Sequence, residues 1–363
     1  MAIRFYLNQQ AHAGNLLLMN RFAAPLAVLF FAICTLSSVA ASVNGQNYVP
    51  LANWAAANGL KTFWLARGAG IGVTNPATRL RFKVDSHDAE INGVHVVLSF
   101  PVANVKGVPL IAQLDLDKTV QPLLFPSRYA APKKIMTICL DPGHGGKDPG
   151  NQIGTFFRHA EKTYTLALAL ELRDQLKRAG FNVILTRNKD TFVELPARPA
   201  IANRAGADLF ISLHFNAVES GSGEVQGPET YCITPVGAAS SNAQGEGANH
   251  AATAANRYES NSLLLAYQVQ KSLVQYLGAE DRGARRARFA VLRDTAMPAI
   301  LIEGGYMSHP AEGKKLYSAA YRRQMAGALV KAIQAYQRLT SPPPPANRAA
   351  VNTRGSAVPL RTR

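Results

Sequence analysis

Cysteine is scarce in this chain of 363 residues, which contains only Cys34, Cys139 and Cys232. So few cysteines exclude a small scaffold held together mainly by disulfide bonds. Cys139 and Cys232 both lie in apolar, strand-like runs. We therefore expect two buried free thiols, although an oxidising compartment permits a disulfide between them.

Acidic residues are also few, with 23 Asp and Glu against 39 Lys and Arg and a net charge of +16. Residues 1–43 and 341–363 hold six arginines and no acidic residue, which leaves +10 for the rest of the chain. A basic body attracts nucleic acid, anionic lipid or an acidic wall polymer, and a solvated basic surface without a partner is equally open. No motif interleaves aromatic and basic residues, so we expect no nucleic-acid partner.

Long hydrophobic runs are absent beyond the first 41 residues. Leu26–Ile33 is apolar and is followed by the small residues of Ser37–Ala41. This pattern predicts a secretory signal peptide over residues 1–41, cleaved near Ala40 or Ala41. The run is short for a spanning helix, although an uncleaved anchor stays open. We expect a periplasmic or extracellular protein with no stable membrane span after cleavage.

Short alternating apolar runs, separated by turn residues, predict a small β-rich accessory domain over residues 44–128. Asn92-Gly93 lies between two such runs and indicates a hairpin, and Trp54–Gly59 is typical of a short helix that ends at its glycine.

The same region resembles the copper amine oxidase N-terminal-like domain at Tyr48–Leu51, Trp54–Ala56 and Ile91–Pro101. His87 and His95 stand apart and lack further ligands, so no copper site is expected. A packing or recognition role is the prediction for this domain.

After a linker at residues 127–134, strand-like runs alternate with longer amphipathic stretches. This alternation predicts an α/β domain over residues 134–340, with a mostly parallel sheet flanked by helices. Val236–Ser260 is rich in small and polar residues and is predicted to be an exposed loop. The basic, proline-rich residues 341–363 are predicted to be a disordered tail.

Four residues stand where an α/β enzyme keeps its reactive groups. His144, His214 and Glu303 each follow a short apolar run, so they lie at the carboxyl ends of predicted strands, where open α/β sheets bind ligands. Glu161 opens an amphipathic helix. Singly, each has an ordinary structural explanation, such as a glycine turn, a paired core histidine or a helix-dipole glutamate. Together, two imidazoles and a carboxylate suit zinc, and a second carboxylate suits a general base.

These residues belong to a longer pattern that resembles the zinc-dependent N-acetylmuramoyl-L-alanine amidases of bacterial cell walls, the type-3 amidase group. The matches follow one another over residues 135–338: Leu140–Gly146, Glu161-Lys162, Leu185–Arg187 with Asp190, Arg198, Ala202-Asn203, Ala207-Asp208, Ser212–Ala217, Pro228–Tyr231, Val291–Arg293, Pro298–Glu303 and Pro310–Glu312. The resemblance implies a zinc amidase/exopeptidase-like fold. It also implies that His144, Glu161 and His214 hold one Zn²⁺ and that Glu303 is the catalytic carboxylate.

The sequence also departs from the family pattern. At Gly304–His309 the family more often has Gly-Phe, a small apolar residue and then Ser-Asn. Neither His309 nor His159, which is close to Glu161 in the sequence, is expected to bind the metal. Some relatives carry an inhibitory helix over the metal in the region of Val236–Ser260. That segment has no apolar stripe here, so no self-blocking helix is expected.

The resemblance implies a secreted hydrolase that cleaves the amide bond between N-acetylmuramic acid and L-alanine in peptidoglycan, for wall turnover or cell separation. Glu303 would take a proton from the attacking water and pass it to the leaving amine. Peptidoglycan is then the substrate, with an activator protein as a further partner. A zinc peptidase acting on another amide bond and a non-catalytic wall-binding protein are the alternatives.

Overall fold

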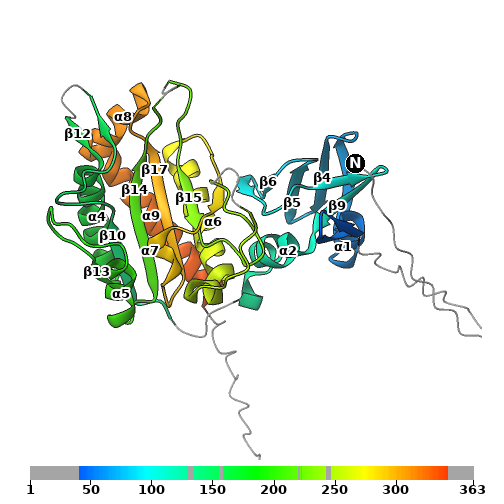
Figure 1. Ribbon diagram of the computed structural model, residues 1–363, viewed down its shortest axis with the longest axis horizontal. Helices are drawn as coiled ribbons and strands as arrows, with labels where there is room; N and C mark the ends of the chain where they lie inside the picture. Colours follow the sequence, from blue (N-terminus) through cyan, green and yellow to red (C-terminus); the bar gives the residue numbers. More distant parts are fainter. Residues whose placement is uncertain are drawn as a thin grey trace, which may run out of the picture. The chain divides into compact units, whose positions relative to one another are not determined.

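The computed structural model describes residues 41–129, 134–154, 158–219, 221, 223–242 and 247–341 (Figure 1). The predicted signal peptide and the predicted tail lie outside the described residues, except for Ala41 and Ser341. In the described part, no helix is both long and apolar enough to cross a membrane.

The α/β part is built on a mostly parallel sheet, which confirms the predicted fold class. Its parallel strands, in spatial order, are β13 (Asn182–Leu185), β10 (Thr137–Pro142), β14 (Leu209–Asn216) and β17 (Ala299–Tyr306). The next strand, β15 (Glu229–Cys232), is antiparallel to β17, and β16 (Ala284–Arg286) is parallel to β15.

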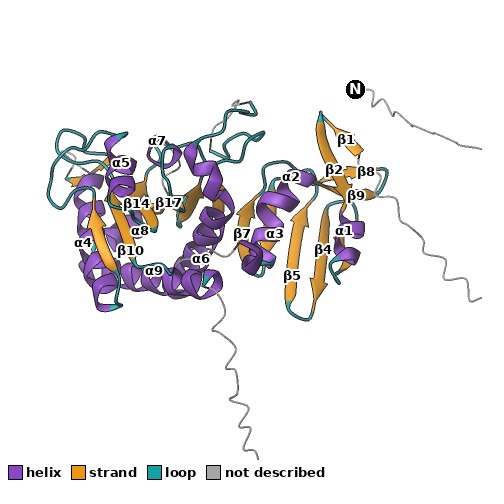
Figure 2. Ribbon diagram, turned by 90° about the horizontal axis from the view of Figure 1, so that it is seen from below, coloured by secondary structure: helices purple, strands orange, loops and turns teal. Residues whose placement is uncertain are grey.

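Helices cover both faces of this sheet (Figure 2). The longest, which pack on one face, are α4 (Glu161–Arg178), α6 (Glu259–Leu277) and α9 (Ala319–Thr340). The shorter α5 (Ala197–Arg204) and α7 (Ala290–Arg293) cover the other face, and α8 (Pro310–Tyr317) follows β17.

Alternation of side chains along the strands explains these two layers. Ile138 and Leu140 of β10 join the core under the long helices, whereas Cys139 between them joins the core under α5 and α7. Successive side chains of a strand point to opposite faces, so a strand covered on both faces is largely apolar along its length. Cys139 on β10 and Cys232 on β15 are buried free thiols, as expected.

The accessory unit is a small antiparallel β half-barrel. One of its sheets has the strands β1 (Ala41–Val43), β2 (Gln46–Pro50), β9 (Val108–Ala112) and β8 (Ala103–Val105), and α1 (Leu51–Ala57) packs beside β2 and β9. The other strands are β3 (Lys61–Ala66), β4 (Gly70–Asn75), β5 (Thr78–Lys83), β6 (Asp88–Ile91) and β7 (Val94–Val97).

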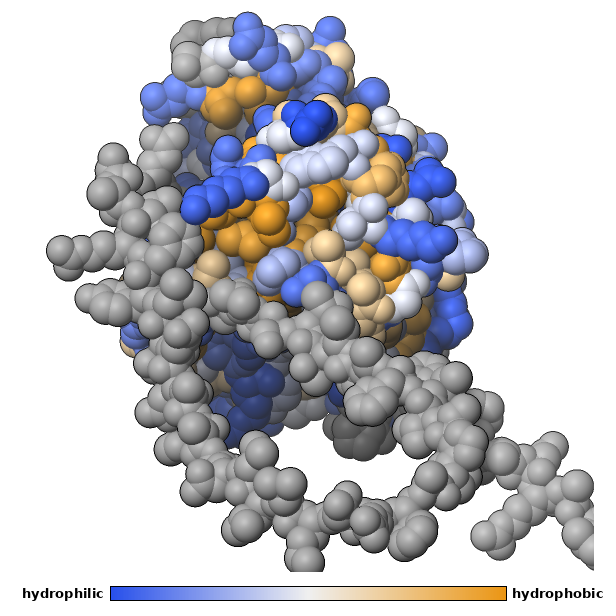
Figure 3. Space-filling model, turned by 90° about the vertical axis from the view of Figure 1, so that its right-hand side faces the viewer, coloured by the Kyte–Doolittle hydropathy of each residue, from blue (hydrophilic) through white to orange (hydrophobic). Residues whose placement is uncertain are grey.

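The predicted hairpin and the predicted short helix are both confirmed. Asn92 and Gly93 join β6 to β7 with φ angles of 49° and 82°, the left-handed conformation that a tight two-residue turn requires. Seen from the right-hand side of Figure 1, hydrophobic and hydrophilic residues are intermingled on the surface (Figure 3).

The second accessory sheet continues into the α/β sheet. Val96 of β7 pairs with Ala284 of β16, which gives one sheet of 11 strands. Tyr267 of α6 also donates its hydroxyl to the Ile91 carbonyl at 2.8 Å. Between the two parts the chain forms α2 (Gln113–Asp115), η1 (Leu116–Val120), α3 (Gln121–Leu124) and η2 (Pro126–Tyr129). The predicted domain boundaries stay a prediction.

The segment Val236–Ser260 is irregular over most of its described length, as predicted, but it is only partly exposed. Ala238 and Ala255 are fully buried, and η4 (Ala254–Tyr258) begins with a capping box between Thr253 and Asn256. Residues 243–246 lie outside the described part. Small side chains fit close-packed sites as readily as exposed loops, so composition misled the prediction here.

Candidate metal and catalytic site

His144 lies in a tight turn directly after β10. Its φ is +61°, and Gly145 and Gly146 that follow are also left-handed. A Cβ at Gly143 would lie 2.3 Å from the His214 ring, so only glycine allows the two imidazoles to come together. The rings of His144 and His214 meet edge to face, with centroids 4.9 Å apart.

Two buried arginines hold this turn in place. Arg187 Nη2 donates to the Gly143 carbonyl at 2.8 Å, and Arg198 Nη2 donates to the His144 carbonyl at 3.0 Å. The Asp141 carboxylate, itself fully buried, accepts hydrogen bonds from Arg198, Thr186 and Ser212. These contacts explain why Thr186, Arg187 and Arg198 belong to the sequence pattern.

Glu161, the first residue of α4, places its carboxylate between the two histidines. Its Oε1 accepts from His214 Nδ1 and from the Phe215 backbone N–H, both at 3.0 Å, and its Oε2 lies 3.1 Å from His144 Nε2. The Asn151 side chain and backbone N–H also donate to Oε2. Burial favours the neutral acid, but hydrogen bonds from His144 and His214 outweigh it and hold the pKa of Glu161 far below its usual range.

The three predicted metal ligands therefore form one cluster, with ligand atoms that all lie within 4.8 Å of one another. Two imidazoles and a carboxylate with room for a fourth ligand are the donor set of catalytic zinc sites. Asp148 Oδ2 lies 2.8 Å from His144 Nδ1, so the other ring nitrogen faces Glu161. Outer-sphere carboxylates orient metal-binding histidines in this way. The residues present thus fit a zinc ion.

Glu303 lies on β17, in register with His214 on one side and with Glu229 of β15 on the other. Its Oε2 is buried and has no hydrogen-bond partner among the described residues. Burial, and then the charges of Glu161 and Glu229, raise the pKa of Glu303 well above its usual range. A buried carboxyl oxygen without a partner is costly and indicates a functional role.

Glu229, directly opposite Glu303, is by contrast well bonded. Its carboxylate accepts from Arg282 Nε at 2.7 Å, from the Tyr231 hydroxyl at 2.6 Å and from the Tyr306 hydroxyl at 3.0 Å. The negative charge that faces Glu303 is therefore fixed in position.

A cavity of about 360 Å³ joins these groups. All three candidate ligands and Glu303 line it, together with Asn151 and apolar side chains that include Leu195, Phe289 and Val291. The structure thus brings all four residues predicted from the sequence to one place. It adds Asp148, Asn151 and Glu229, to which sequence reasoning assigned no role, although Asp148 and Asn151 follow His144 within seven residues.

The other two histidines near these motifs have partners of their own. His159 Nδ1 lies 2.5 Å from the Tyr164 hydroxyl, and its ring stacks on Tyr317 at 3.8 Å. His309 caps α8 by accepting from the Glu312 backbone N–H.

An α/β sheet with this donor set and a free carboxylate at its strand ends defines a metal-dependent hydrolase. The family model for N-acetylmuramoyl-L-alanine amidases matches residues 138–335, more than half of the chain. The chain belongs to this family. The match begins at residue 138, so the resemblance of residues 44–128 to the copper amine oxidase N-terminal-like domain stays a prediction.

Individual relatives are similar over the same region. N-acetylmuramoyl-L-alanine amidase AmiC of Neisseria meningitidis is 35% identical over 220 residues, which cover 55% of this chain and 52% of AmiC. LytC of Bacillus subtilis, also an N-acetylmuramoyl-L-alanine amidase, is 35% identical over 56% of this chain and 36% of its own length. The chain therefore spans about half or less of these two relatives.

Similar solved structures include the N-acetylmuramoyl-L-alanine amidase of Clostridium difficile 630, which is 31% identical, with a TM-score of 0.47, over 57% of this chain and 98% of that chain. The CwlD amidase from Clostridioides difficile, solved in complex with the GerS lipoprotein, is 27% identical, with a TM-score of 0.46, over 57% of this chain and 99% of that chain.

Proposed function

We propose that this protein is a zinc-dependent amidase that hydrolyses the bond between N-acetylmuramic acid and L-alanine in peptidoglycan, outside the cytoplasm. The observation that carries the proposal is the convergence of His144, Glu161, His214 and Glu303 on one cavity. Family membership supports the choice of bond.

The residues of the site have separate tasks. When bound, a zinc ion supplies Lewis acidity toward a water molecule and an amide carbonyl. His144, Glu161 and His214 would hold this ion, and Glu161 contributes the negative charge of the set. Asp148 and Asn151 hold His144 and Glu161 in turn.

Glu303 moves the proton. Glu303 lines the cavity, where its carboxyl group can accept a proton from the attacking water and return it to the leaving amine. Burial and the nearby charges of Glu161 and Glu229 raise the pKa of this carboxyl group well above its usual range, which makes it a stronger proton acceptor than an ordinary glutamate. The products are a glycan with a free lactyl carboxylate and a peptide that begins with L-alanine.

The location and partners follow from the proposed substrate. A signal peptide over residues 1–41 would deliver the enzyme to the periplasm or the cell exterior, and its net positive charge favours an anionic wall. The activator protein stays a prediction.

Digestion of intact peptidoglycan, followed by mass spectrometry of the fragments, tests the proposal. We expect the wild type, but not Glu303→Gln, to release peptides with a new amino-terminal L-alanine. Glu194→Gln, at an exposed glutamate, is the matched control and should behave as the wild type. Cleavage inside the peptide would instead indicate the zinc peptidase, and binding without cleavage the wall-binding protein.

A further inference from the structure

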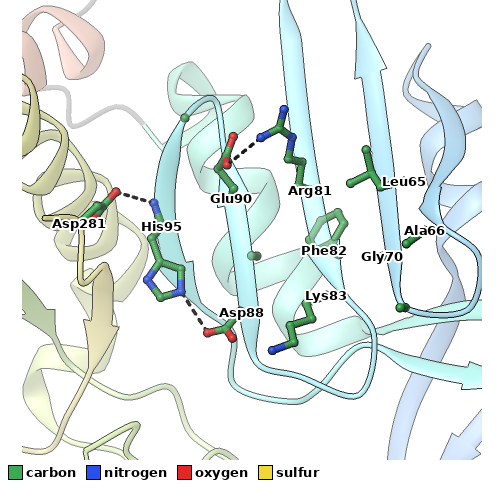
Figure 4. Close-up of a pocket in the computed structure, with 13 residues that line it drawn as sticks. Leu65, Ala66, Gly70, Arg81, Phe82, Lys83, Asp88, Glu90, His95 and Asp281 are labelled. Carbon is green, nitrogen blue, oxygen red and sulfur yellow. Dashed lines mark hydrogen bonds and ion pairs between the residues drawn. The ribbon is translucent and has the colours of Figure 1, made fainter.

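A cavity of about 510 Å³ lies on the outer face of the accessory sheet, but its charges are largely matched. Arg81 Nη1 lies 3.2 Å from Glu90 Oε2, and His95 Nε2 lies 3.1 Å from Asp88 Oδ1. Figure 4 shows how these side chains lie around the cavity. Lys83 is its remaining cation, and Asp281 adds a further carboxylate. This cavity offers little net attraction to a charged ligand.

A second hollow, between α6 and α9, has a very different charge balance. It measures about 350 Å³, and its walls carry Lys271 of α6 with Lys331 and Arg338 of α9. No acidic residue lines it. Within the described part of the chain, none of these three cations has a carboxylate within ion-pair distance.

Helical spacing directs these cations into the hollow. Lys331, Gln334 and Arg338 are three and four residues apart and share one face of α9, as Lys271 and Gln275 share one face of α6. Lys331 Nζ lies 3.8 Å from the centroid of the half-exposed Tyr276 ring, which fixes its position. Three like charges around one hollow repel one another, and a bound anion relieves that repulsion.

The shape and chemistry of the hollow favour a discrete anionic group. A concave site admits a carboxylate from a flexible polymer more readily than a flat membrane surface, and the Arg338 guanidinium can bind both carboxylate oxygens. Under the proposed function, the polymer carries carboxylates on its peptides, and each cleavage creates another on a lactyl group.

We propose that the hollow between α6 and α9 is a second peptidoglycan-binding site, which holds carboxylates of the polymer away from the catalytic cavity. This inference rests on the proposed function. The two sites share no residue, since the catalytic cavity is lined from the strand ends and the hollow from the outer surfaces of two helices. A second contact raises the local concentration of polymer at the catalytic cavity.

Sedimentation with insoluble polymer tests this site directly. Two variants are compared. The first carries Glu303→Gln, which prevents cleavage, and the second carries Lys271→Gln and Lys331→Gln in addition. We expect about tenfold weaker binding for the second protein, as for two partly exposed charge contacts. Intact peptidoglycan is used as insoluble sacculi, and glycan strands stripped of peptides, which are soluble, are immobilised on beads and tested separately. If the second variant binds more weakly only to intact peptidoglycan, the site binds peptide carboxylates. If it binds more weakly only to stripped strands, the site binds lactyl carboxylates. Unchanged binding to both overturns the proposal.

Lys177→Gln with Lys314→Gln is the matched control, because it removes the same charge from exposed positions of the α/β part that line neither cavity. This control should bind nearly as well as the parent protein. An equal loss in the control would show that total charge, and not the hollow, determines binding, and would overturn the proposal.

A soluble muramoyl-peptide fragment separates this inference from the proposed function. In the catalytically competent protein, the Lys271→Gln and Lys331→Gln changes should leave kcat/KM for the fragment unchanged and raise KM for the polymer. Failure of the wild type to cleave the fragment would reject the proposed function. The sedimentation assay would still test the hollow, because it measures binding and not cleavage. Equal loss of activity on fragment and polymer would overturn the second site.

Discussion

At the scale of single residues, two glutamates of the site have opposite environments. Glu161 accepts hydrogen bonds from His214, Phe215 and Asn151, and this holds it as an anion. Glu303 has a buried oxygen without a partner among the described residues, and its pKa moves in the opposite direction. A pair of carboxyl groups whose pKa values are pushed apart is the usual basis for separate roles in binding and proton transfer.

Glu303→Gln should lower kcat by about 10²–10⁴-fold, because proton transfer is lost while the ligand cluster is intact. Zinc content, measured by elemental analysis, should equal that of the wild type. The melting temperature should not fall, since the change removes a buried, unpaired carboxyl group. Full activity in this variant would exclude Glu303 as the proton carrier.

Asp148→Asn should weaken zinc binding by about 10–100-fold, because the carboxylate that orients His144 is lost. Competition with a chelator measures this affinity. The exposed Asp174→Asn on α4 is the control and should retain wild-type affinity. Equal affinity in both variants would show that Asp148 does not orient a ligand.

The three candidate ligands and Glu303 could be predicted from the sequence, because apolar runs indicate where strands end and helices begin. Asp148, Asn151 and Glu229 could not, because their roles depend on contacts between separate loops and strands. Glu229 is 74 residues before Glu303 in the chain, and only the antiparallel pairing of β15 with β17 brings them together.

At the scale of elements, β14, β17 and β15 place His214, Glu303 and Glu229 in one row across the sheet. Burial raises the pKa of Glu229, but the charge of Arg285 and hydrogen bonds from Tyr231 and Arg282 outweigh it and lower the pKa. The strands and the β6–β7 turn could be predicted from local sequence patterns. The buried positions of Val236–Ser260 could not be predicted, because their burial depends on residues that are distant in the chain.

Glu229→Gln should lower the free energy of unfolding by about 2 kcal/mol at neutral pH, since the charged bonds to Arg282 and Tyr231 are lost. The folded-state pKa is depressed, so the stabilisation is fully present above the unfolded value of 4.5 and disappears as pH falls through the folded value. Melting temperatures of both proteins from pH 7 to pH 3 should therefore converge in acid. A constant difference at every pH would contradict the charge-based explanation.

At the scale of the whole molecule, one sheet joins the accessory strands to the α/β strands through β7 and β16. Buried Arg286 of β16 supports this junction by donating to the Lys118 carbonyl of η1 at 2.6 Å and to the Ile233 carbonyl at 3.2 Å. Its charge also faces the fully buried Asp115. The pairing of Val96 with Ala284 has no local signal in the sequence, because strand partners far apart in the chain are chosen by the completed fold.

Arg286→Ala should lower the free energy of unfolding by about 3 kcal/mol, because it leaves two buried carbonyls unpaired and Asp115 without its counter-charge. Denaturant unfolding measures the change, and the exposed Arg204→Ala is the control. Loss of stability no larger than in the control would show that the junction does not depend on Arg286.

In the proposed enzyme, His144, Glu161 and His214 form one zinc site at the strand ends. Anomalous X-ray scattering at the zinc edge, from crystals of the protein with zinc, tests it most directly. We expect one strong peak within coordination distance of His144, Glu161 and His214 and next to Glu303. A peak bound by other residues, or none at this cluster in zinc-saturated crystals, would contradict it.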